Sequence, residues 1–136
     1  MKTLTEAIQN FQKLPMETAR EIIKRTSYKV IDRTPVRTGL LANSWVPTKN
    51  RPSTRRIKTV DKTKRKAKNK VRKTVANLKA GDTFYLTNNQ PYSLIIEMGR
   101  REGPPAQGSY LAPLGMLRIT VAEFQSIVNQ IVSRSR

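Results

Sequence analysis

Positive charge is concentrated in one stretch of this sequence, and that concentration limits how the chain can fold. Residues 49–79, here called the basic segment, contain 14 lysines and arginines and one acid, Asp61. The whole chain of 136 residues has a net charge of +18, so the residues outside the basic segment are only mildly basic, at +5. Like charges at this density repel one another and oppose compaction. We therefore expect a single α+β domain over residues 1–136, with the basic segment as an insert or arm within it.

The two halves of the basic segment differ in pattern. Residues 49–66 are flanked or interrupted by prolines and are expected to be mobile in the free protein. In the second half, apolar residues at helical spacing predict a narrow stripe on a basic helix, with Gly81 as its C-terminal stop. The stripe consists of Ala67, Val71, Val75 and Leu78. Two compatible interpretations stay open: a docked amphipathic helix with a solvated basic face, and direct contact of that face with phosphates.

A polyanionic partner is the usual counterpart of a pI near 11, although an assembly can also neutralise such charge. The basic segment contains no aromatic residue, so any nucleic acid would be contacted at its backbone rather than its bases. The expected contacts to DNA or to neighbouring subunits come from the basic side chains Arg51, Arg55, Arg56, Lys58, Lys62, Lys64, Arg65, Lys66, Lys68, Lys70, Arg72 and Lys73.

The rest of the chain predicts a long N-terminal helix, a small and mainly antiparallel sheet, and a C-terminal helix. A helix over residues 3–33 is either broken or restarted at Pro15. Strands are expected at residues 40–46, ended by Pro47, and at residues 83–87. Two further helices are expected. A short one starts at Pro91, runs through Met98 and is closed by Gly99. The last lies within residues 114–132, with the apolar stripe Leu117, Val121, Phe124, Val128 and Ile131.

Several classes of chemistry are excluded by composition. The sequence has no histidine and no cysteine, which removes disulfides, structural zinc sites and Ser-His-Asp chemistry. No glycine-rich phosphate-loop motif occurs. Glu97 is the one carboxylate whose surroundings suggest partial burial, and an ion pair with arginine is favoured over catalysis. We therefore expect no catalytic residue, no metal and no cofactor.

Glu17 and Glu21 are expected on an exposed, salt-bridged face of the first helix. No apolar run is long enough to span a bilayer, and the N-terminus lacks the apolar core of a signal peptide. A soluble protein made in the cytoplasm is expected.

Three segments in order resemble one family. The first reads TPVRTGLLANSW over residues 34–45, the second FYLTNNQPY over residues 84–92 followed by LIIEMG at 94–99, and the third APLGMLRITVAEF over residues 112–124. Together they resemble the tail completion, or head–tail joining, proteins of long-tailed bacteriophages. The basic segment is where the chain departs from this pattern, since the family's connection there varies and is often less basic.

The resemblance implies a small α+β structural subunit, not an enzyme, that forms a ring of six copies at the phage neck or the top of the tail. It implies other neck and tail proteins as partners, and a location in the virion after synthesis in the host bacterial cytoplasm. The motif residues are given structural roles: turn residues Pro35, Thr38 and Gly39, sheet packing by Trp45, and a helix set by Tyr92, Glu97 and Gly99.

Within such a ring, the arms would face either the genome, as phosphate contacts, or acidic neighbouring subunits. The alternative is a free-standing, sequence-nonspecific nucleic-acid-binding protein, which composition alone would favour. A small nuclease or toxin ranks last because no acidic cluster supports it. A role of the basic helix at a membrane surface lacks the bulky apolar face expected of it.

Overall fold

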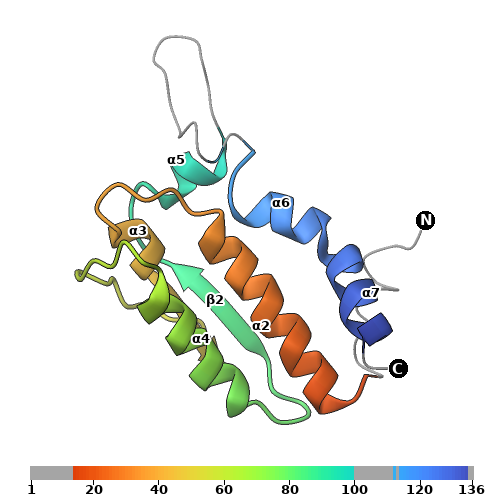
Figure 1. Ribbon diagram of the computed structural model, residues 1–136. Coiled ribbons are helices and arrows are strands. Elements are labelled where there is room, and N and C mark those ends of the chain that lie inside the picture. The colour runs from red at the N-terminus through yellow and green to blue at the C-terminus, as the bar shows by residue number, and fades with distance from the viewer. Residues whose placement is uncertain (1–13, 100–111, 113, 135–136) are drawn as a thin grey trace.

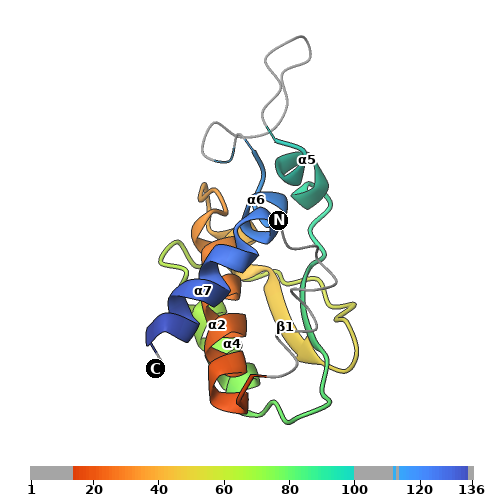
Figure 2. The same cartoon turned by 90° about the vertical axis from the view of Figure 1, so that its right-hand side faces the viewer.

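A computed structural model of the chain describes residues 14–99, 112 and 114–134. Four helices form one layer, with α2 between α4 on one side and α6 and α7 on the other (Figure 1). A two-stranded antiparallel sheet, β1 paired with β2, lies against this layer (Figure 2). The α+β class expected from the sequence is therefore confirmed. The elements in chain order are α2 (Met16–Asp32), α3 (Leu40–Asn43), β1 (Trp45–Lys49), α4 (Arg65–Ala76), β2 (Phe84–Asn88), α5 (Ser93–Glu97), α6 (Leu117–Ala122) and α7 (Phe124–Arg134).

The central helix α2 begins where the sequence predicts a restart. Pro15 is its N-cap residue, with a φ of −56°, and the backbone N–H of Ala19 donates to the Pro15 carbonyl at 3.0 Å. The fixed φ of proline suits this position, and its missing N–H costs no helical hydrogen bond there. The helix ends at Asp32, three residues before Pro35. The part of the predicted helix at residues 3–13 lies outside the described residues.

The predicted strand at residues 40–46 is wrong in its first part. Leu40–Asn43 is a short helix, and strand β1 starts only at Trp45. Gly39 causes the difference: at a φ of +86° its carbonyl accepts the N–H of Asn43 at 3.1 Å, which closes a helical turn. Pro47 does not end the strand but pairs with Leu86 inside it. Both strands of a two-stranded sheet are edge strands, where proline is tolerated.

The second strand and the short helix after it follow the prediction closely. The strand expected at 83–87 is β2, shifted by one residue at each end. The helix expected at 91–98 is shorter, Ser93–Glu97, and Pro91 lies in the turn before it rather than at its first position. Gly99 follows the helix with a φ of +86°, as expected of a closing glycine.

The single C-terminal stripe predicted over residues 114–132 is divided in the structure. Helices α6 and α7 are separated at Glu123, whose carboxylate accepts from Arg33 at 2.7 Å and pairs with Lys29 at 3.5 Å. Leu117 and Val121, expected on the apolar face, are 40% and 53% exposed. The break changes the face presented to the core, so the stripe is continued only in α7, by Ile127, Val128 and Ile131.

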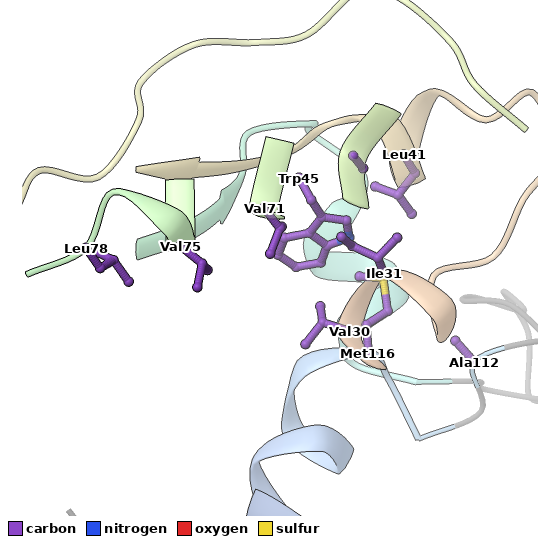
Figure 3. Packing of buried hydrophobic residues seen from close by; sticks show 10 residues of the cluster. Val30, Ile31, Leu41, Trp45, Val71, Val75, Leu78, Ala112 and Met116 are labelled. Carbon is purple, nitrogen blue, oxygen red and sulfur yellow. The ribbon is translucent and has the colours of Figure 1, made fainter. Parts of the chain in front are cut away.

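The core has two clusters, one on each side of α2. The smaller cluster joins Ile22 to the buried residues of α7. In the larger one, Trp45 lies among side chains from α2, α3 and α4 (Figure 3). Its indole N–H donates to the hydroxyl oxygen of Thr34 at 2.8 Å, and that hydroxyl donates to the carbonyl of Val30 at 2.8 Å. Trp45 therefore packs the sheet onto α2 with its polar atom satisfied.

Candidate nucleic-acid interface

Helix α4 has an apolar inner face and a basic outer face. Ala67, Val71 and Val75 are buried in the larger core cluster, together with Leu78 just after the helix. This corrects the idea that the whole basic segment hangs from an independent body, since residues 65–78 supply part of the core. The docked amphipathic helix, one of the two interpretations left open by the sequence, describes α4 well. The helix ends at Ala76, five residues before Gly81.

The stretch between β1 and α4 is held by side-chain amides rather than left free. The Gln90 side-chain amide donates to the carbonyl of Ile57 at 2.6 Å, and Asn89 donates to the carbonyls of Ser53 and Arg55, both at 2.9 Å. Asn43 donates to the carbonyl of Thr59 at 3.1 Å. These contacts tie the stretch, which the sequence predicts to be mobile in the free protein, to α3 and to the turn after β2.

The sequence did not predict that these amide side chains would hold the stretch before α4. Asn89 and Gln90 lie in a run that predicts a turn, and Asn43 was assigned to a strand. These contacts are hard to predict because the sequence position of an asparagine or glutamine does not indicate which distant backbone group its amide will bond. Two amide oxygens, those of Asn43 and Gln90, are buried without a hydrogen-bond partner.

Three of the twelve basic residues singled out from the sequence fasten α4 to the fold. The ammonium groups of Lys64 and Lys68 contact the carbonyl and the carboxylate of Asp32, at 2.7 and 2.5 Å. Because Asp32 is the last residue of α2, these cations also lie at the negative end of that helix. The ammonium of Lys70 donates to the carbonyl of Asn43 at 3.2 Å. These three lysines have a structural role whatever else they bind.

Burial perturbs two of these three lysines. Partial burial lowers the pKa of Lys64, although Asp32 opposes the shift. Partial burial also lowers the pKa of Lys70, and there the positive charge of Arg55 adds to the effect instead of opposing it. Lys70 and Arg55 are therefore two cations held near each other without a carboxylate to balance them among the described residues.

The other nine basic residues have no side-chain hydrogen bond or ion pair with any part of the chain that the structure describes. Most of them are exposed on the outer side of α4 and on the stretch before it. They are Arg51, Arg55, Arg56, Lys58, Lys62, Arg65, Lys66, Arg72 and Lys73.

The acids within reach of these cations are already engaged. The Asp61 carboxylate accepts from the hydroxyl and N–H of Thr63 and from the N–H of Lys66, at the start of α4. These contacts, led by the Thr63 hydroxyl, lower the pKa of Asp61 to about 2. The N–H of Lys79 and the amide of Asn50 likewise lower the pKa of Asp82. The surface around α4 therefore presents many unpartnered positive charges, which is the electrostatic character of a phosphate-contacting surface.

The motif residues of the first segment form the turn between α2 and α3. The Thr38 hydroxyl accepts the N–H of Leu40 at 3.2 Å, and Pro35 precedes the turn in partly buried surroundings. A side chain on Gly39 would overlap the Asp61 backbone, and the Gly39 carbonyl accepts the Asp61 N–H at 3.2 Å. The turn therefore positions the start of the basic segment's helix.

Glu97 joins α5 to the start of α6. Its carboxylate accepts the N–H groups of Met116, Leu117 and Arg118 at 2.7–2.9 Å, so it caps α6 from a distance. The Arg118 guanidinium lies 3.5 Å from the same carboxylate, which confirms the ion pair favoured from the sequence. Tyr92, at the N-cap of α5, is 39% exposed.

Neither a metal site nor a membrane span is found in the described part of the chain. Residues 14–99, 112 and 114–134 contain no group of three or more acidic side chains that could hold a metal ion. Over the same ranges, every helix is too short or too polar to cross a bilayer. Comparison of this chain with protein-family models, with curated proteins and with solved structures finds no match.

Proposed function

We propose that this chain is a structural, non-catalytic subunit of the head–tail connection of a long-tailed phage, whose basic surface contacts the DNA backbone. The observation that carries the DNA contact is the set of nine exposed cations on α4 and the stretch before it, none of which has a side-chain partner among the described residues. Such a surface neutralises phosphates and releases their counterions, which is the main source of sequence-independent binding.

The composition of the basic segment indicates contact with phosphates rather than with bases. The basic segment offers no aromatic side chain on which a base could stack. Trp45 and Phe84, the aromatic residues next to it in sequence, belong to the core cluster or pack against it. The proposed binding therefore depends on phosphates and is insensitive to base sequence.

A virion subunit is favoured by the contacts among the three segments that carry the resemblance. Thr34 and Trp45 of the first segment bond to each other, and Trp45 pairs with Asn88 of the second segment in the sheet. Glu97 of the second segment caps the helix of the third. We take these contacts among the three segments as support for a fold shared with the tail completion family.

A free-standing nucleic-acid-binding protein is the second candidate, and one observation weighs against it. Large apolar side chains are exposed on and just after α5 and on and just before α6: Leu94, Ile95, Met98, Leu114, Leu117 and Val121. Apolar surface of this kind on a highly charged protein is typical of assembly. A subunit that associates through α5 and α6, in a ring with other neck proteins, accounts for it better than a solitary protein does.

The test combines oligomeric state, location and binding. We expect the full chain to form rings, alone or with neck proteins, to be found in purified phage particles, and to bind two unrelated DNA duplexes equally. Electron microscopy of particles, light scattering and fluorescence anisotropy measure these three properties. A monomer that binds DNA but is absent from particles would support the second candidate, and a chain with no affinity for DNA would overturn the backbone contact.

A further inference from the structure

We propose that phosphate contact is made mainly by one edge of α4, formed by Lys66, Lys70 and Lys73 together with Arg55 on the facing stretch. This set is called the lysine edge below. The three lysines are spaced at i, i+4 and i+7, which places them in one row along the helix. The inference rests on the proposed function and narrows it, because it divides the basic surface into a contacting part and a part that serves the fold.

The opposite edge of α4, which faces α2, has its cations engaged. Lys64 and Lys68 are held by Asp32, and Lys68 also lies 5.5 Å from the ring centre of Tyr28. Arg72 lines a hollow together with Glu17 and Glu21 of α2. On that edge, carboxylates of α2 lie beside cations of α4 and would repel an approaching phosphate.

The cations of α2 beside that hollow are engaged too. The Arg20 guanidinium donates to the carbonyl of Leu78 at 3.1 Å, and Lys24 and Arg25 pair with Glu21 at 3.0 and 3.7 Å. Free positive charge on this side is therefore limited to Arg65 and Arg72. They provide a natural comparison for the lysine edge.

The lysine edge keeps its charge free. Lys66 and Lys73 are exposed without side-chain partners among the described residues, and Lys70 has only the carbonyl of Asn43. Arg55 is fixed nearby, since its carbonyl accepts from Asn89 at 2.9 Å. Asp61 is the acid at this edge, and its oxygens are occupied by Thr63 and the Lys66 N–H.

Two properties make the edge suited to a phosphate backbone. Burial and the neighbouring Arg55 both lower the pKa of Lys70, so an anion placed between these cations would relieve their repulsion. From Lys66 to Lys73 the row extends roughly 10 Å along the axis at about 1.5 Å per residue. One DNA strand presents a phosphate about every 3.4 Å of helix axis, so the row spans about three phosphates.

The experiment compares two matched double variants of the full chain. Lys66→Gln/Lys73→Gln and Arg65→Gln/Arg72→Gln each remove two exposed charges, seven residues apart, from the same helix. Binding to one DNA duplex is measured by fluorescence anisotropy between about 50 and about 400 mM salt. Melting temperatures by circular dichroism show whether both variants stay folded, which we expect because neither pair makes a side-chain hydrogen bond or ion pair with the described residues.

Each lost phosphate contact lowers the slope of log affinity against log salt by about 0.9, so the lysine variant should lose about 1.8. At about 0.1 M salt, two such contacts correspond to about 60-fold weaker binding. The arginine variant should lose less than half as much slope, and Arg55→Gln alone should lose about 0.9. Equal losses for the two double variants would overturn the lysine edge and leave DNA binding intact. Wild-type protein that binds no DNA would overturn both proposals.

Discussion

Gly39 lies where the turn after α2 meets the stretch that precedes α4. Its φ is +86°, and a Cβ built at this position would lie 2.6 Å from both the carbonyl oxygen of Asp61 and the backbone nitrogen of Lys62. The atoms it would meet belong to the backbone, so no side chain can rotate away to make room. Gly39→Ala should therefore be far more destabilising than a surface substitution.

The loss of unfolding free energy expected for Gly39→Ala has two separable contributions, one from the backbone conformation and one from the close contact. A non-glycine residue in the left-handed region costs about 1–2 kcal/mol. Forcing an extra methyl into packed surroundings adds about 1–3 kcal/mol. The sum of roughly 2–5 kcal/mol corresponds to a melting temperature lowered by about 6–15 °C, at about 3 °C per kcal/mol for a chain of this size. Urea denaturation followed by the fluorescence of Trp45, the single tryptophan, measures the free energy of unfolding directly.

Gly81 provides the control that isolates the contribution of the close contact. Its φ is +89°, almost the same as that of Gly39, but no atom lies within 4 Å of a Cβ built there. Gly81→Ala should thus lose only the backbone term of about 1–2 kcal/mol. If Gly39→Ala proved no more destabilising than Gly81→Ala, the close contact between the turn and Asp61 would be refuted.

Two further predictions concern carboxylates that accept backbone N–H groups. Glu97→Gln weakens the cap on α6, and we expect a loss of about 1–3 kcal/mol in unfolding free energy; the exposed Glu17→Gln serves as control, and a similar loss there would contradict the cap. Because the pKa of Asp61 is lowered to about 2 from 3.8, its contribution to stability is present above about pH 4 and lost as the pH falls through about 2. Asp61→Asn should lower the urea midpoint at pH 7 and flatten its fall between those pH values, and an unchanged pH profile would show that Asp61 is not the group responsible.

Features set by local rules were predictable from the sequence. The restart of α2 at Pro15 depends only on the fixed φ of proline, and β2 on a run of aromatic and β-branched residues. The need for glycine at position 39 also follows from the turn itself. None of these depends on a distant partner, which is why the sequence was sufficient for them.

Features that depend on distant contacts were not predictable in the same way. Residues 41–44 are buried on all sides, so alternation of apolar and polar residues had no meaning there. The break between α6 and α7 is accompanied by contacts of Glu123 with Arg33 and Lys29 from α2, about ninety residues away in sequence. For the candidate site, the cations could be listed from the sequence, but their partners in the fold could not be predicted from it.

Some cations of the basic segment hold the fold together, and others remain exposed on its surface. Lysine has a long apolar stem, so a lysine-rich helix can lie on a core while its ammonium groups reach outward or along the surface. Helix α4 does this: its three small apolar residues, with Leu78 just after the helix, place it in the core, and Lys64, Lys68 and Lys70 are then tied to carbonyl and carboxylate oxygens. The high net charge is therefore compatible with a folded segment in the free protein. A polyanion would then bind a surface that is already formed by contacts within the chain.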